Sequence, residues 1–345
     1  MTAGGGGIAT VLVVGCGSIG RRHLRNLKAL KVPVVLGVDP REDRRQEAAE
    51  ESGAVTFASL EEALAYKPAA VVVSTPSALH LPIAFKAARH GCHLFIEKPL
   101  SHNLDHVDEL IDLTSGQRLV TMVGCNYRFD RSLNMVKRLL EDCAIGNVAT
   151  ARAEFGLFLP DMHPYEDYRD FYAARSSLGG GVILDRTHEL DYLRWMFGEV
   201  DGVTGFYDKR SYLDIDTEDV AEILLRFQSG VLASVHLDYL QAEYRCVVRV
   251  VGDRGVIEWN FNPQLVRLYS HATREWKTLL DVPKPNINEM YVEELRHFLE
   301  AVETGRMTCY DLSEGRKTLG LLMRIKSGSL GAASSKSLGV LDGLR

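Results

Sequence analysis

The chain has 345 residues, which at roughly 150 residues per domain predicts about two domains. Hydrophobic residues make up 46% of it and charged residues 25%, so it can bury packed cores and does not have the composition of a disordered protein. The net charge of −6 argues against nucleic acid or an anionic membrane as the main partner, because both require a basic surface. We expect no transmembrane segment and no signal peptide, since no apolar run approaches ~20 residues and no basic segment precedes the first apolar stretch.

The six cysteines are widely spaced and form no CxxC pair. This spacing is typical of a reduced, cytoplasmic protein rather than of a disulfide framework or a zinc site. We therefore expect a cytoplasmic protein without a bound metal ion.

The first third of the chain alternates short β-branched runs with amphipathic helical patterns. Such alternation predicts a parallel sheet covered by helices on both faces, the doubly wound Rossmann arrangement. The predicted strands are Thr10–Val14, Val34–Val38, Ala54–Phe57, Ala70–Ser74, His93–Ile96 and Leu119–Gly124. The helical patterns between them include Arg21–Leu30, Arg44–Ser52 and Leu60–Ala65.

From Val148 to about Leu280 strand-like segments follow one another without helices, which predicts one large, mostly antiparallel open sheet. The predicted strands are Val203–Tyr207, Val220–Phe227, Val231–Asp238, Cys246–Val251, Gly255–Asn260 and Val266–Ser270, followed by helices Glu289–Glu303 and Ser313–Lys326. We predict a dinucleotide-binding domain over 1–126, an α+β substrate and oligomerisation domain over 127–326 and a loosely held tail over 327–345. Because a large open sheet must cover its second face, we expect a homo-oligomer, a dimer or tetramer, formed through this sheet.

The strongest local signal is Gly15-Cys16-Gly17-Ser18-Ile19-Gly20, which directly follows a predicted strand and opens a helix. Gly15, Gly17 and Gly20 allow a tight turn, close approach to a pyrophosphate and helix–sheet packing, and the helix N-terminus then faces the phosphates. Asp39 ends the second strand 19 residues after Gly20, near the spacing expected for an acid that binds ribose hydroxyls. This context predicts a nicotinamide dinucleotide site rather than an ordinary glycine-rich turn.

The choice between NAD and NADP depends on the residues around Asp39. A carboxylate at this position favours NAD because it repels a 2′-phosphate. Arg41, Arg44 and Arg45 follow directly and offer guanidinium groups that suit such a phosphate, although residues of this kind more often form the solvated face of a helix. We predict NAD, with NADP as the alternative, and include Arg41 in the cofactor site.

Polar residues follow the fourth and fifth strands, where ligands bind in parallel sheets. Ser74, Thr75 and Pro76 close the fourth strand, so we expect them and His80 to border the cofactor. Taken alone, His80 suits the start of a helix better than catalysis. The fifth strand ends in Glu97-Lys98-Pro99, and Lys98 there suits proton transfer or hydrogen bonding to an alcohol.

A second glycine-rich segment runs from Gly179 to Asp191 as GGGVILDRTHELD. Asp185 and His188 are three residues apart, which predicts one shared helix face. The helix dipole disfavours imidazolium while Asp185 favours it, and such a balance would let His188 titrate near neutral pH, as a general base requires. Taken alone, the segment is better interpreted as a first-turn acid and a structural histidine above a stripe of core residues. Two possible ligands without a third are weak evidence for a metal.

In combination these segments resemble the glucose–fructose oxidoreductase, inositol dehydrogenase and rhizopine-catabolism (GFO/IDH/MocA) family. The resemblance rests on GCGSIG, Asp39, STPSALH, Glu97-Lys98-Pro99, GCNYRF at Gly124–Phe129 and GGGVILDRTHELD. It implies a Rossmann domain, a second domain with a large open sheet for oligomerisation, and hydride transfer between nicotinamide and a hydroxyl carbon of a sugar, cyclitol or nucleotide-linked sugar. The resemblance also implies that Lys98, preceding a cis peptide, contacts nicotinamide and substrate, that His188 is the catalytic histidine and that Asp185 is its acidic partner.

The spacing Asp-Arg-Thr-His departs from many members, which have one more residue between the acid and the histidine. A branch that resembles this shorter form is often linked to surface-polysaccharide sugars. For the substrate we add Asn126, Arg128, Arg169 and Tyr172, which flank the predicted cleft. Arg128, Arg169 and Arg175 together would suit a carboxylate or phosphate, although structural salt bridges are an equally good interpretation of each.

The sequence thus predicts an NAD(P)-dependent sugar dehydrogenase or reductase with a small-molecule substrate. In the oxidative direction His188 takes the hydroxyl proton while Lys98 stabilises the alkoxide. Two alternatives stay open at this point. One is a family member that acts on a dihydrodiol or an imine, and the other is a nicotinamide-binding sensor without catalysis.

Overall fold

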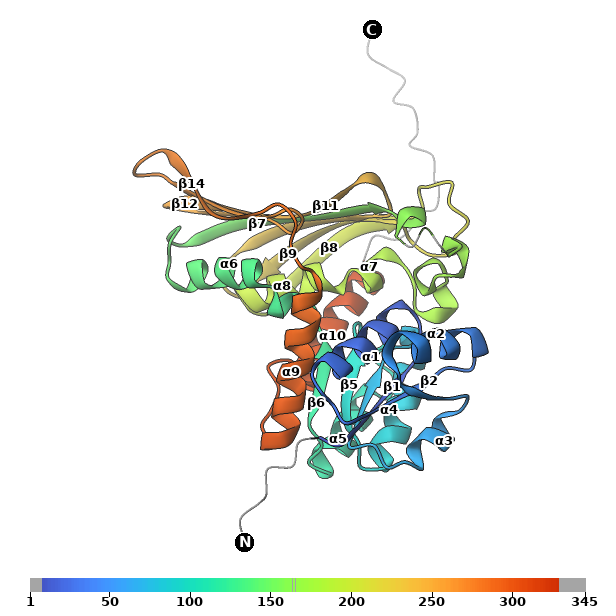
Figure 1. Ribbon diagram of the computed structural model, residues 1–345. Coiled ribbons are helices and arrows are strands. Elements are labelled where there is room, and N and C mark those ends of the chain that lie inside the picture. Colours follow the sequence, from blue (N-terminus) through green and yellow to red (C-terminus); the bar gives the residue numbers. More distant parts are fainter. Residues whose placement is uncertain (1–7, 163, 165, 329–345) are drawn as a thin grey trace.

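The computed structural model describes residues 8–162, 164 and 166–328 (Figure 1). The tail expected at 327–345 lies outside the described residues except for its first two positions, which belong to the last helix. In the described ranges no helix is both long enough and apolar enough to cross a membrane.

The first domain is built on a six-stranded sheet in the order β3-β2-β1-β4-β5-β6, and every pairing is parallel. Its central strands are almost entirely buried apolar runs, as a sheet covered on both faces requires, whereas the edge strand β3 is partly exposed. The strands are β1 Thr10–Val14, β2 Val34–Val38, β3 Val55–Phe57, β4 Ala70–Val73, β5 His93–Glu97 and β6 Thr121–Gly124. The helices are α1 Ser18–Ala29, α2 Glu42–Ser52, α3 Leu60–Leu64, α4 His80–Arg89 and α5 Val107–Gly116.

The second domain contains an eight-stranded sheet in the order β14-β13-β12-β11-β7-β10-β9-β8. Its strands are β7 Val148–Phe158, β8 Val200–Asp208, β9 Val220–Phe227, β10 Leu232–Asp238, β11 Leu240–Gly252, β12 Gly255–Asn260, β13 Gln264–Ser270 and β14 Glu275–Val282. The sheet is mostly antiparallel, as predicted, and the exception lies at its centre, where β7 and β10 pair in parallel. A parallel pair needs a long crossover, and 159–231 provide it, with α7, α8, β8 and β9 inside.

The helices of the second domain cover one face of this sheet (Figure 1). They are α6 Arg131–Glu141, α7 Val182–Asp185 and α8 Thr187–Phe197. The burial of β9 alternates strictly, with Ala221, Ile223 and Leu225 buried toward the helices and Leu224 exposed on the other face. Within the described part of the chain no helix covers that outer face.

Two C-terminal helices return to the first domain (Figure 1). Helix α9, Asn288–Thr304, packs against α1, and α10, Leu312–Gly328, packs against both α8 and β6. The Val123 backbone N–H also donates to the Tyr310 carbonyl at 2.9 Å. The two domains are thereby joined along a broad contact beside the site. Short 3₁₀ turns complete the described chain at Ser77–Leu79, Asn126–Phe129, Leu159–Asp161, Tyr168–Asp170, Tyr172–Ala174 and Ser176–Leu178.

Candidate functional site

A cavity of about 690 Å³ lies between the two domains, within the size range of small-molecule sites. The carboxyl ends of the parallel strands form one wall, where ligands bind in this architecture. The segment 157–188 and the ring of Tyr244 from β11 form the opposite wall. Sequence-predicted residues that line it are Gly17, Ser18, Ile19, Ser74, Thr75, Pro76, Glu97, Lys98, Asn126, Tyr172, Asp185 and His188.

The glycine turn between β1 and α1 has the shape that a dinucleotide requires. Gly15 has a φ of 94°, and a Cβ at Gly20 would lie 1.7 Å from the Gly15 carbonyl oxygen. A Cβ at Gly17 would meet nothing closer than an Arg44 nitrogen at 3.9 Å, so this side of the turn is open to the cavity. No side chain caps the start of α1, which leaves its N–H groups available for a pyrophosphate. These residues fit the cofactor predicted from the sequence.

Asp39 lies directly behind this turn. Its carboxylate accepts hydrogen bonds from the backbone N–H groups of Cys16 and Arg41, each at 2.9 Å. Neither Asp39 nor Arg41 lines the cavity, and the exposed Arg41 guanidinium pairs with Asp43. Of the three arginines that follow Asp39, only Arg44 lines the cavity.

His80 lies behind the cavity wall rather than in it. Its buried ring has Nδ1 3.0 Å from the Pro99 carbonyl oxygen and Nε2 2.8 Å from that of Thr75. Burial lowers the pKa of this imidazole, and the two carbonyl oxygens oppose that shift. His80 thus contacts both loops that follow β4 and β5. The loop after β5 contains the cis peptide bond between Lys98 and Pro99 that the resemblance implied.

The amino group of Lys98 is bound to Asp185. Its Nζ donates to the Asp185 carbonyl at 2.7 Å and to the carboxylate Oδ1 at 3.1 Å. The Tyr172 hydroxyl also donates to Oδ1, and the Tyr239 hydroxyl donates to Oδ2 at 3.0 Å. Burial alone would raise the pKa of Asp185, but the charges of Lys98 and Arg186 and these hydrogen bonds lower it to about 2. Asp185 is therefore a fixed carboxylate that orients Lys98.

His188 does not pair with Asp185, contrary to the prediction of one shared helix face. The chain leaves helical geometry at Arg186, so Asp185 ends α7 and His188 belongs to α8. The His188 ring instead stacks on Tyr127, with ring centroids 4.4 Å apart and an interplanar angle of 6°. Burial, followed by the positive charges of Lys98 and Arg186, holds its pKa well below 6.5. The prediction of titration near neutral pH was wrong, and His188 is a neutral imidazole.

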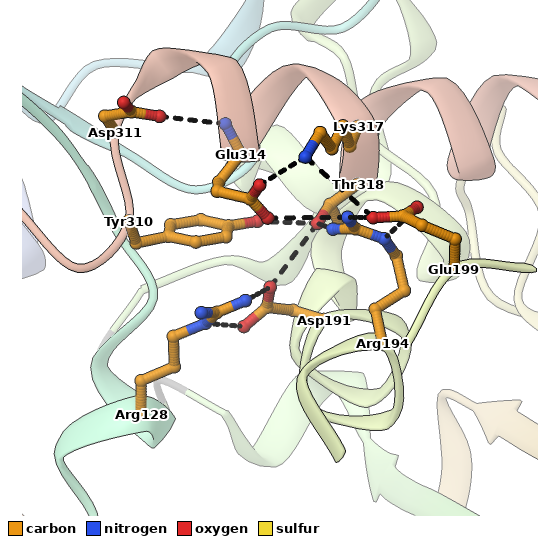
Figure 2. Close-up of polar contacts among 9 residues, drawn as sticks. All are labelled: Arg128, Asp191, Arg194, Glu199, Tyr310, Asp311, Glu314, Lys317 and Thr318. Carbon is orange, nitrogen blue, oxygen red and sulfur yellow. Dashed lines mark hydrogen bonds and ion pairs between the residues drawn. The ribbon is translucent and has the colours of Figure 1, made fainter. Parts of the chain in front are cut away.

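Arg128, predicted to contact substrate, lies outside the cavity (Figure 2). Its Nε and Nη2 each donate to the Asp191 carboxylate at 2.9 Å. The two side chains are only 8% and 2% exposed, and the guanidinium also lies 4.1 Å from the centroid of the Tyr310 ring. Beside this pair, Arg194 on α8 joins Glu199 at 2.6 Å and Thr318 on α10 at 2.7 Å. Arg128 therefore belongs to the network between the domains.

The predicted arginine cluster for an anionic substrate is not assembled. Arg169 pairs with Asp167 at the surface, and Arg175 donates to the Arg169 carbonyl at 2.9 Å. Neither of them lines the cavity. The sequence places the polar run 163–175 at the cleft, and Glu166 and Asp170 of that run line the cavity. Sequence reasoning missed other lining residues, among them Arg22, Asp161, Arg186 and Tyr244.

Two family models match the chain. The model described as an oxidoreductase family with an NAD-binding Rossmann fold matches residues 9–125, and the GFO/IDH/MocA C-terminal domain model matches residues 133–258. The chain belongs to the GFO/IDH/MocA family. Membership confirms the predicted family, the two-sheet fold and NAD as cofactor.

Curated relatives and solved structures extend over nearly the whole chain. It is 28% identical to myo-inositol 2-dehydrogenase from Thermotoga maritima over 338 residues, or 94% of this chain and 95% of the relative. Inositol 2-dehydrogenase from Burkholderia cenocepacia is 26% identical over 307 residues, 86% of each chain.

Among solved structures, levoglucosan dehydrogenase with NADH and levoglucosan has a TM-score of 0.83 at 20% identity, covering 92% of this chain and 96% of that one. An oxidoreductase from Agrobacterium radiobacter with NAD⁺, L-tartaric acid and magnesium has a TM-score of 0.82 at 21% identity. The match covers 93% of this chain and 96% of that one. At these identities the structures show the shared fold.

Proposed function

We propose that the protein is an NAD-dependent dehydrogenase that oxidises a hydroxyl-bearing carbon of an uncharged sugar or cyclitol. The observation that carries this proposal is the placement of Lys98, Asp185 and His188 in the wall of one cavity with the open glycine turn. The similarity to inositol 2-dehydrogenases over most of the chain supports a polyol as substrate.

The site residues divide the proton chemistry between them. Lys98 has three N–H donors, and two of them are bound to Asp185, which leaves the third for a substrate oxygen. His188 makes no hydrogen bond to the described residues, and its low pKa keeps it in the form that accepts a hydroxyl proton. The bound cofactor supplies the hydride acceptor, while Lys98 stabilises the charge that develops on the substrate oxygen.

The charges in the cavity wall favour an uncharged substrate. Asp161, Glu166 and Asp170 line it and repel carboxylates and phosphates. Among the cationic lining residues, Arg186 is neutralised by Glu189 at 3.0 Å. Arg44 lies beside the glycine turn, where it suits the cofactor phosphates.

The test monitors reduction of NAD or NADP by its near-ultraviolet absorbance. The purified protein is incubated with either cofactor and a panel of inositols, aldoses, acidic sugars, nucleotide-linked sugars, aromatic dihydrodiols and cyclic imines. We expect reduction with inositols or other neutral polyols. Turnover only with a dihydrodiol or an imine would identify an enzyme that acts on a non-sugar. No turnover with any compound, together with retained NAD binding, would favour a sensor.

The residue assignment is tested with Lys98→Met. We expect a loss of about 10²–10⁴-fold in kcat, with NAD binding retained, because the variant removes the donor to the developing alkoxide. Lys86→Met, which changes an exposed lysine that pairs with Glu61, is the matched control. Turnover of Lys98→Met near that of the control would contradict the mechanism.

We propose NAD rather than NADP as the preferred cofactor. The Asp39 carboxylate lies beside the glycine turn, where it would repel a 2′-phosphate. Comparing kcat/KM for the two cofactors tests this preference. Asp39→Ala should shift the ratio toward NADP, and an unchanged ratio would show that Asp39 does not discriminate.

We propose that the protein forms a homo-oligomer through the outer face of the eight-stranded sheet. Leu224 and Leu232 lie on that face and are 57% and 53% exposed, close to Phe206 on β8. Leu224→Glu should convert a dimer or tetramer to monomers in size-exclusion chromatography with light scattering. Met307→Glu, at an exposed position far from this face, is the control, and a monomeric wild-type protein would contradict the proposal.

We also propose that the protein works in the reducing cytoplasm. All six of its cysteines are free, and Cys16, Cys92, Cys125 and Cys246 are buried. The test is the effect of a reductant on the purified protein. We expect no change in its urea midpoint or elution volume with dithiothreitol, whereas a large change would indicate a disulfide.

A further inference from the structure

Three ionisable side chains meet behind the cavity wall. His23 from α1, Glu97 from β5 and Glu294 from α9 each direct one atom into a space in which all three atoms lie within 4.8 Å of one another. His23 and Glu294 are fully buried, and Glu97 is 8% exposed. The reaction proposed above uses none of the three directly, although Glu97 is the immediate neighbour of Lys98.

Glu97 connects this cluster to the lysine. Its Oε2 accepts a hydrogen bond from the Lys98 backbone N–H at 3.2 Å, so the Glu97 carboxylate helps to fix the peptide from which the lysine side chain extends. Its Oε1 lies 2.7 Å from His23 Nε2. The His23 ring is in turn packed edge-on against Phe95 and Tyr291.

Glu294 has no such partner. Both of its carboxylate oxygens are buried and make no hydrogen bond to the described residues. An ionised carboxylate in this state is strongly destabilising, and the nearest acid, Glu97, adds repulsion of like charge. Burial and then Glu97 raise the pKa of Glu294, and the opposing charge of Arg22 lowers it by less.

Either a proton or a bound cation would neutralise this buried acid, and the contact of His23 favours the proton. His23 Nε2 lies 2.7 Å from Glu97 Oε1, at hydrogen-bond distance; with Glu97 ionised, Nε2 donates to it and has no lone pair free for a metal. The other groups that face Glu294 are Arg22 on α1, which lies over the Tyr291 ring at 4.3 Å, and Tyr291 itself. The thiols of Cys125 and Cys309 also feel the charge of Glu294, and Lys98 lies on the far side of Glu97.

We propose that Glu294 is held protonated and uncharged at neutral pH, which leaves Glu97 as the one carboxylate of the cluster, and that Glu294 is thereby a positioning residue for Lys98. Loss of the proton would place two carboxylates side by side. Glu97 would then be pushed from the Lys98 N–H and from His23, and the lysine would lose its alignment. The positioning role rests on the proposed dehydrogenase function, whereas the protonation state does not.

Infrared difference spectroscopy tests the protonation state without any substrate. The wild-type spectrum minus that of Glu294→Gln at neutral pH should contain the carbonyl band of a buried, protonated carboxyl group. In the wild-type protein alone, this band should disappear on titration to alkaline pH, which keeps the test valid if the variant does not fold. Absence of the band would overturn the proposal, as would one equivalent of metal in elemental analysis of the purified holoprotein.

Kinetics test the positioning role. We expect Glu294→Ala to lower kcat at least fivefold with little change in the Kd for NAD, and Glu294→Gln to restore most of that loss. The kcat of the wild-type protein should fall over the same alkaline pH range in which the infrared band disappears. The kcat of Glu294→Gln should not fall over that range. Glu293→Gln, an exposed neighbour on the same helix, should retain the wild-type profile. An alkaline limb that persists in Glu294→Gln would overturn the role, whereas a wild-type protein that turns over no polyol would contradict the proposed function alone.

Discussion

Replacing Arg128 with methionine separates two interpretations of this residue, substrate contact and contact between the domains. The sequence favours the first, and the structure places the guanidinium in a buried pair with Asp191 (Figure 2). Methionine retains much of the aliphatic bulk of arginine but leaves the Asp191 carboxylate without its charged partner. The remaining donor to that carboxylate is the Thr318 hydroxyl at 3.4 Å.

The structure sets the size of the expected effect. Both side chains are at least nine-tenths buried, so solvent does little to screen the charge that is left behind. Breaking such a pair from one side costs about 3–5 kcal/mol, whereas replacing both partners with apolar residues is often nearly neutral. We therefore expect Arg128→Met to lose about 3–5 kcal/mol of unfolding free energy and the double variant Arg128→Met/Asp191→Leu to recover at least about half of it.

The assay is urea unfolding followed by tryptophan fluorescence, since Trp195 lies 5.6 Å from the Arg128 guanidinium and reports on this contact. Substrate KM is measured in parallel on the folded variant. A loss below about 1 kcal/mol, or a double variant less stable than Arg128→Met, would refute the reasoning. A raised KM with unchanged stability would restore the substrate-contact interpretation.

Two further predictions concern the glycine turn and the sheet. Gly20→Ala should abolish NAD binding in fluorescence titration, because the added Cβ would lie 1.7 Å from the Gly15 carbonyl oxygen; near-wild-type affinity would contradict this geometry. The hydrogen bond to Asp238 raises the pKa of His236 from 6.5 to about 9, so the pair stabilises the fold fully below pH 6.5 and loses this contribution as the pH rises through 9. Since the His236 side chain is partly exposed and one of its partners, Glu222, lies at the surface, we expect only about 1 kcal/mol. This is measured as a fall in the urea midpoint between pH 6.5 and 9 that His236→Gln lacks.

The first domain was predictable because its signals are local. Buried β-branched runs alternate with helices, and the glycine turn joins one strand to one helix, so each assignment needed fewer than about 20 neighbouring residues. The observed strands accordingly begin and end within two residues of the predicted ones. Lys98 and His188 were placed in the cavity wall by the same kind of signal, a motif at the end of a strand or the start of a helix.

The remaining errors involve partners far apart in the chain. Nothing near Arg128 indicates that Asp191, 63 residues later, will bind it. The spacing of Asp185 and His188 predicted one helix, but Lys98, 87 residues earlier, holds Asp185 at the end of α7. Tyr239, the other phenol on Asp185, carries no local signal at all.

The parallel pairing of β7 with β10 also determines which parts of the protein can form first while the chain is being synthesised. β7 is complete at residue 158, but its neighbours in the sheet lie between residues 232 and 252, and Tyr172, Asp185 and His188 are in the loop that this pairing closes. The strands of the first domain are already complete at residue 124. At synthesis rates of roughly 5–20 residues per second, the nascent chain carries the strands of the dinucleotide-binding sheet for roughly 6–23 s before β11 is made. The protein thus acquires the glycine turn and Lys98 well before it acquires Asp185 and His188.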